Sequence, residues 1–129
     1  MIDRAASADP DLAKRREKVL TTATLRAAEM MGLSNGDLAR VLGLSPASTT
    51  RMRQGSFTLD PAGKSFELAQ MLVRLFRSLD SILGGDLDSM RSWLLSPNSA
   101  LNGTPLALIQ TVRGLVATAD YVDSRRAVL

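Results

Sequence analysis

Three arginines and several short polar side chains lie in one stretch of the chain, where they could recognise a nucleic acid. Arg40, Arg51 and Arg53 could neutralise phosphates, because a guanidinium keeps its positive charge and offers several hydrogen-bond donors. The short polar residues between them could approach the edges of bases in a groove. This combination of residue types indicates binding of a polyanion.

Two short helices joined by a glycine turn must position these side chains, and the sequence predicts both. Ser34 can cap the first helix, and Asp37 suits its first turn, where negative charge is favourable. Gly43 allows the positive φ of a tight exit, and Ser45 followed by Pro46 predicts the start of the second helix. The pattern is typical of a helix-turn-helix, although an ordinary helical hairpin in an all-α core has similar spacing.

The second short helix would present its N-terminal half to a major groove while Thr49 and Met52 face the core. Thr49 departs from the usual pattern, since a branched aliphatic residue commonly occupies that position. The residues expected near base edges are Ser45, Ala47, Ser48, Thr50 and Arg51. The residues expected to meet phosphates are Arg40, Arg53, Gln54 and Lys64.

Missing residue types exclude most catalytic and metal-binding chemistry. The 129 residues include no cysteine and no histidine, so disulfides, thiolate or imidazole metal sites and histidine-based triads are excluded. Asp86 and Asp88 could form a pair of catalytic carboxylates, but their position at a predicted helix start favours capping. We expect no enzyme activity, no cofactor and no metal; a small carboxylate enzyme is the third hypothesis for the function.

The positive charge belongs to the half of the chain that holds the helix-turn-helix. Residues 1–66 contain ten Lys/Arg and seven Asp/Glu, whereas residues 67–129 contain six of each, which accounts for the net charge of +3. No apolar run approaches the length of a membrane span, and the first residues lack the apolar stretch of a signal peptide. We therefore expect a cytoplasmic protein without membrane contact.

Helical spacing of apolar residues elsewhere predicts an all-α protein without strands. After a tail of residues 1–8, one helix is expected from Pro10 to about Met31 and another from Asp60-Pro61 to about Leu83. The wide apolar stripe of the latter could also pack on a second copy of the chain, which would make a homodimer.

Three further helical pieces are expected toward the end of the chain. Asp86 would cap a helix of about nine residues, and Thr104 followed by Pro105 would open the last helical region. Gly114 would divide that region, with Thr111 capping the second piece. The expected apolar face consists of Ile109, Val112, Leu115, Val116, Ala119 and Val122.

An ordered set of motifs runs through this second half. The motifs are Ser92-Trp93-Leu94, Ser96-Pro97-Asn98, Leu101-Asn102-Gly103-Thr104-Pro105-Leu106, Ile109, Thr111 and Gly114-Leu115. Together they resemble the toxin-binding domain of the Xre/MbcA/ParS antitoxin family over about residues 65–126, and the first half fits the Xre-type domain that precedes it. We therefore expect a helix-turn-helix DNA-binding region over residues 1–64 and a small helical toxin-binding domain over residues 65–129.

The resemblance implies a function that needs no catalysis. Such antitoxins form dimers and cover the substrate cleft of a RES-type toxin that degrades NAD, and they can repress their own operon. Under this hypothesis the expected toxin contacts are Arg113, Tyr121, Asp123, Arg125 and Arg126. The main alternative is a helix-turn-helix repressor whose C-terminal half only dimerises it.

Overall fold

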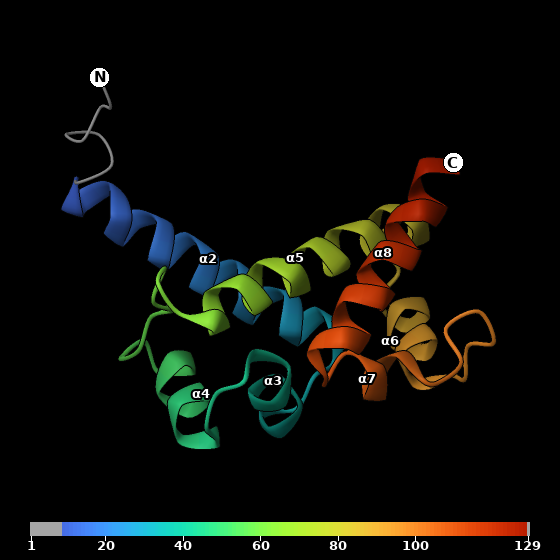
Figure 1. The fold of residues 1–129 in the computed structure, drawn as a ribbon, viewed down its shortest axis with the longest axis horizontal. Helices are drawn as coiled ribbons and strands as arrows, with labels where there is room; N and C mark the ends of the chain where they lie inside the picture. Colours follow the sequence, from blue (N-terminus) through green and yellow to red (C-terminus); the bar gives the residue numbers. More distant parts are fainter. Residues whose placement is uncertain (1–8, 129) are drawn as a thin grey trace.

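The computed structural model describes residues 9–128, and all the regular elements in this range are helices (Figure 1). They are α2 (Pro10–Met31), α3 (Asn35–Leu42), α4 (Pro46–Arg53), α5 (Lys64–Leu83), α6 (Leu87–Leu95), α7 (Pro105–Leu108) and α8 (Val112–Val128). Within these residues the extended pairing consists of an isolated bridge between Asn98 and Gly103. The predicted all-α class is confirmed, while the division of the chain after residue 64 stays a prediction.

The first three of these helices begin as the sequence predicts. Asp9 caps α2, and Ser45 caps α4 by accepting the Ser48 N–H at 3.1 Å. Ser34 and Asp37 form a reciprocal capping box at the start of α3, and Gly43 ends that helix with φ of 67°. Because side-chain oxygens satisfy N–H groups that have no helical partner, these caps fix where each helix starts.

The prediction that Asp60-Pro61 begins a helix is wrong, since α5 begins at Lys64 with Gly63 as its cap. The Asp60 carboxylate accepts the Ala62 N–H at 2.9 Å, and the Gly63 N–H donates to the Asp60 carbonyl at 2.8 Å. Residues 60–63 therefore form a turn, in which the Asp60 side chain and carbonyl both accept hydrogen bonds from nearby backbone N–H groups. The helix starts only after this turn.

Helix α5 lies at the centre of the structure and packs against α2, α3, α6 and α8 (Figure 1). Its buried side chains meet those of all four neighbours in one continuous core. Each fully buried aliphatic side chain of this kind stabilises the fold by roughly 1.5–3 kcal/mol. The largest fully buried apolar side chains are Leu38, Leu42, Met52, Leu59, Leu72, Leu75, Met90, Leu94, Ile109, Leu115 and Val122.

Helix α6 closes the end of α2. Arg91 donates to the carbonyl oxygens of Met30 and Glu29 at 3.2 and 3.0 Å, and its side chain covers Gly32, the left-handed residue that ends α2. These carbonyls lie in the last turn of the helix, where acceptors lack the usual partner four residues on, and the Glu29 carbonyl also accepts the Gly32 N–H at 3.1 Å. A side chain from the second half of the chain thus completes a helix of the first half.

The last helical region is divided before Gly114 rather than at it. Helix α7 stops after Leu108, and the Thr111 hydroxyl accepts the Gly114 N–H at 3.0 Å, so Thr111 caps α8 as predicted. Gly114 lies inside the first turn of α8, against the end of α7. Its role is close approach between two helix ends.

The expected apolar face of α8 is wrong at two positions. Val112 and Val116 are 62% and 37% exposed, whereas Leu115, Ala119 and Val122 are buried. The helix is interrupted at residues 109–111, so α8 begins at Val112 in a new orientation. Helical spacing counted from α7 therefore does not predict which side chains of α8 face the core. Two valines therefore remain on the outside of the molecule.

Asp86 begins α6 and gives a testable pH property. The Ser89 hydroxyl donates to its carboxylate at 2.9 Å, and this bond, with the Ser89 and Asp88 backbone N–H groups, lowers the pKa of Asp86. A lowered folded-state pKa means that the stabilisation is present above the unfolded-state pKa and is lost as the pH falls through the folded-state value.

We expect Ser89→Ala to raise the pKa of Asp86 toward its ordinary value. Carboxyl-carbon NMR titration of the two proteins measures the difference, and Ser92→Ala, an exposed serine of the same helix, is the control. An unchanged Asp86 titration in Ser89→Ala would contradict the assigned cause.

Candidate nucleic-acid interface and C-terminal binding face

Helix α4 is held in place by two buried side chains and leaves its other face in solvent. Thr49 and Met52 are buried, as predicted, while Ala47, Thr50 and Arg51 are exposed. The Thr49 hydroxyl donates to the Ser45 carbonyl at 3.1 Å, so its polar atom is satisfied within the helix. Its methyl group can then fill the core position that a branched aliphatic residue usually takes.

Three of the residues expected near base edges are joined by hydrogen bonds. The Ser45 hydroxyl donates to the Ser48 hydroxyl at 3.0 Å, and Arg51 Nη2 donates to the same Ser48 oxygen at 3.0 Å. The guanidinium is thereby held along the exposed N-terminal half of α4. A preordered arginine loses less conformational freedom when it binds a guanine edge or a phosphate.

Asn35 is a residue of this site that the sequence analysis missed. Its amide nitrogen lies 3.4 Å from the Pro46 carbonyl and 3.3 Å from the Thr50 hydroxyl, and its oxygen accepts from Arg53 Nε at 3.1 Å. The first helix of the motif thus fixes both the start of α4 and the Arg53 guanidinium. An asparagine at the first position of α3, directly after a serine cap, was the available signal.

Of the remaining residues expected at phosphates, Gln54 lies at the end of α4, whereas Arg40 and Lys64 lie on other helices. Arg40 lies on α3, where it pairs with Asp37 at 3.0 Å and donates to Gln110 Oε1 at 2.7 Å. Lys64 begins α5 and pairs with Glu67 at 3.1 Å. Gln54 is exposed at the end of α4. Arg40 therefore lies between the helix-turn-helix and the α7–α8 junction.

The expected toxin contacts on α8 fall on different sides of that helix. Arg113 is exposed in the first turn, beside the exposed Val112 and one turn from Val116. Arg125 is exposed near the other end, and Tyr121 is half-buried against the core. Arg113, Val112 and Val116 form an exposed apolar and cationic surface, which we call the α8 face.

Asp123 and Arg126 do not lie on the α8 face, because they contact α5. Asp123 forms an ion pair with Arg74 and accepts from the buried Ser78 hydroxyl at 2.6 Å. Arg126 Nη1 lies 3.4 Å from the same hydroxyl. The network ties the end of α8 to α5. Both residues therefore have partners within the chain, and their role as toxin contacts stays a prediction.

Among residues 9–128, no group of three or more acidic, histidine or cysteine side chains is placed to hold a metal ion. In the same range no helix is both long and apolar enough to cross a membrane.

Two family models match the chain, and they meet inside α5. Residues 11–74 match the antitoxin Xre-like helix-turn-helix domain, and residues 78–127 match the antitoxin Xre/MbcA/ParS C-terminal toxin-binding domain. The matches follow each other in chain order and leave three residues between them. No curated protein matches the chain.

Proposed function

The chain belongs to the family of antitoxins that join an Xre-like helix-turn-helix to an Xre/MbcA/ParS toxin-binding domain, and from this premise we propose that it neutralises a RES-type, NAD-degrading toxin in the cytoplasm. It covers the cleft of the toxin and performs no chemistry of its own. The α4 surface binds the operator of its own operon and represses transcription, and the protein acts as a homodimer.

The observation that supports the proposal is that two separate exposed surfaces, on α4 and on α8, lie on one core. The exposed half of α4 carries an ordered arginine, and the α8 face carries exposed valines beside an arginine. Exposed large apolar side chains next to a cation are common at protein interfaces, where arginine is enriched. An antitoxin that also represses its operon needs both kinds of surface.

Coexpression with the product of the neighbouring gene tests the proposal directly. The tagged chain is expected to copurify with that product, and the purified toxin is expected to consume NAD only when the antitoxin is absent. Protection of NAD by a chain that does not bind the toxin would overturn the mechanism. A chain that binds operator DNA but captures no neighbouring product would favour the plain repressor, in which the valines of the α8 face meet a second copy.

We expect Val116→Asp to weaken toxin binding by about tenfold or more, because it places a charge in the apolar part of the α8 face. Isothermal titration of the toxin into each antitoxin variant measures the change. Leu12→Asp is the matched control, since Leu12 and Val116 are 38% and 37% exposed and Leu12 lies on α2. Equal loss in both variants would show a general defect, and no loss in Val116→Asp would remove α8 from the interface.

A further inference from the structure

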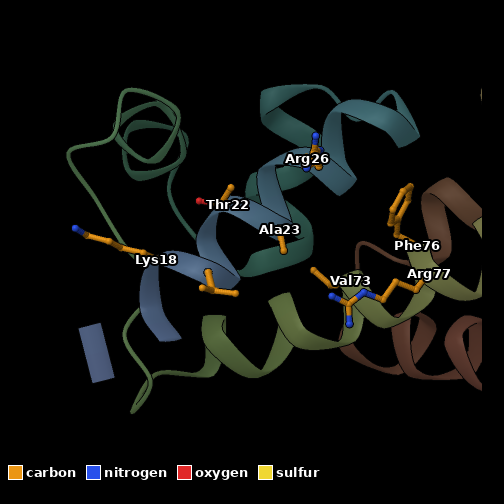
Figure 2. A pocket seen from close by; sticks show the side chains of 8 residues that line it. Lys18, Thr22, Ala23, Arg26, Val73, Phe76 and Arg77 are labelled. Carbon is orange, nitrogen blue, oxygen red and sulfur yellow. The ribbon is translucent and has the colours of Figure 1, made fainter. Parts of the chain in front are cut away.

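A groove between α2 and α5 lies apart from the α4 surface and from the α8 face, and Arg126, one of the expected toxin contacts, lines its larger hollow. Two adjoining hollows form it and share Val19, Ala23, Val73 and Arg77; the larger has a volume of about 930 Å³. Figure 2 shows one end, where Ala23 on α2 and Val73 on α5 point toward one another; Lys18, Thr22 and Arg26 on α2 and Phe76 and Arg77 on α5 complete the lining. We call these two hollows the α2/α5 groove.

The floor of the α2/α5 groove is apolar and open to solvent. Val19 is 68% exposed, the largest exposed fraction among the large apolar side chains of the described residues. Phe66 and Phe76 line opposite ends and are only partly buried. Exposed apolar side chains that line a hollow between two helices are typical of a binding site rather than of isolated surface residues.

The rims of the groove are cationic. They carry Arg15, Arg16, Lys18 and Arg26 from α2, Arg74 and Arg77 from α5 and Arg126 from α8, and the described lining includes no acidic side chain. Arg74 is paired with Asp123, whereas the ion pairs seen within residues 9–128 include none of the other six. An occupant must therefore bring negative charge together with apolar surface.

This requirement excludes several occupants. A second copy that placed its own groove against this one across a two-fold axis would bring the cationic rims of both copies together, which is unfavourable. Duplex DNA brings negative charge but does not use an apolar floor lined by valines and phenylalanines. A helix with apolar residues on one face and carboxylates beside them matches both features and the elongated shape.

We infer that the α2/α5 groove binds an acidic amphipathic helix of another protein. Leucine, isoleucine or phenylalanine side chains at positions i, i+3 or i+4, and i+7 contact Val19 and Val73. Aspartate and glutamate side chains on the flanks pair with Arg16, Lys18 and Arg77. This surface is separate from α4 and from the α8 face, so the inference does not depend on the proposed function.

A selection from displayed helical peptides tests the inference with the full chain as bait. The peptides have about 16 residues, which span about 24 Å as a helix, and randomised side chains on all faces. Enriched sequences are expected to be acidic and amphipathic. A synthetic representative is expected to bind Val19→Asp and Arg77→Glu about tenfold more weakly than the unmodified protein, because one apolar anchor or one charge partner is lost.

Leu95→Asp is the matched control, because Leu95 is 65% exposed and lies on α6, outside the groove; its affinity for the peptide is expected to be unchanged. Both groove substitutions change exposed side chains, and circular dichroism checks that each variant is folded. Enrichment of basic or neutral peptides, failure to enrich any peptide, or equal binding to the groove variants and the unmodified protein would each overturn the inference. Displacement of the acidic peptide from the groove by duplex DNA or by phosphatidylglycerol vesicles would also overturn it.

Discussion

Replacing Gly114 by alanine is expected to lower the free energy of unfolding by about 3 kcal/mol, because an added β-carbon meets its nearest neighbour at this glycine. A β-carbon built at Gly114 lies 1.9 Å from the Leu108 carbonyl oxygen and 2.6 Å from its carbon, and these are backbone atoms. The clash cannot be relieved by rotating a side chain. Helix α8 would have to move away from the end of α7, which would disturb the packing of Leu115 and Ile109.

Chemical denaturation followed by circular dichroism measures this loss, and Gly36→Ala is the matched control. Gly36 is also a helical glycine, but its added β-carbon meets only the flexible Arg40 guanidinium, at 3.6 Å or more. That substitution is expected to leave stability unchanged or raise it by about 0.5–1 kcal/mol, since alanine favours the helix. Similar stability of Gly114→Ala and the unmodified protein would show that the α7–α8 junction is less tightly packed than the structure has it.

Replacing Arg51 by alanine is expected to weaken operator binding by about 1–3 kcal/mol, or about fivefold to more than a hundredfold in affinity, if this arginine contacts a guanine. Electrophoretic mobility shift with the DNA upstream of the gene measures the loss at fixed salt concentration. Toxin binding is expected to stay unchanged, because Arg51 lies on α4 and the α8 face does not include it.

Arg26→Ala is the control for operator binding, since Arg26 is also an exposed arginine but belongs to α2 and the α2/α5 groove. It is expected to change operator affinity little. Equal losses in the two variants would indicate that DNA is held by general positive charge rather than by the α4 surface. Release of the toxin by Arg51→Ala would contradict the assignment of separate surfaces for DNA and toxin.

Local features of the fold could be predicted from the sequence because short-range chemistry determines them. The Ser34–Asp37 capping box and the Ser45 cap depend on side chains three residues from the N–H groups they satisfy. Thr111 was identified as a cap for the same reason. The prediction of a helix start at Asp60 was wrong because an equally local structure, the turn that ends at Gly63, uses the Asp60 carboxylate as a hydrogen-bond acceptor.

The candidate site depended on long-range contacts that sequence spacing does not contain. Asp123 and Arg126 were expected to face a partner, but their bonds to Ser78 cross from α8 to α5. Arg40 was expected at phosphates, yet its nearest partners include Gln110, seventy positions along the chain. The sequence shows that these side chains are charged. Only the packing of α8 against α5 determines which of them have partners within the chain.

The hydrogen bonds from Arg91 to the end of α2 constrain how such proteins can evolve. A first half paired with a second half from a different ancestor would keep its helix-turn-helix but would lose the guanidinium that covers Gly32 wherever the incoming α6 lacks an arginine at that place. The Met30 carbonyl would then lose this donor, while the Glu29 carbonyl would keep only the Gly32 N–H. Recombination between the genes of such proteins is thus expected to preserve the two halves as one inherited block, and new toxin specificity to arise by substitution on the surface rather than by exchange of domains.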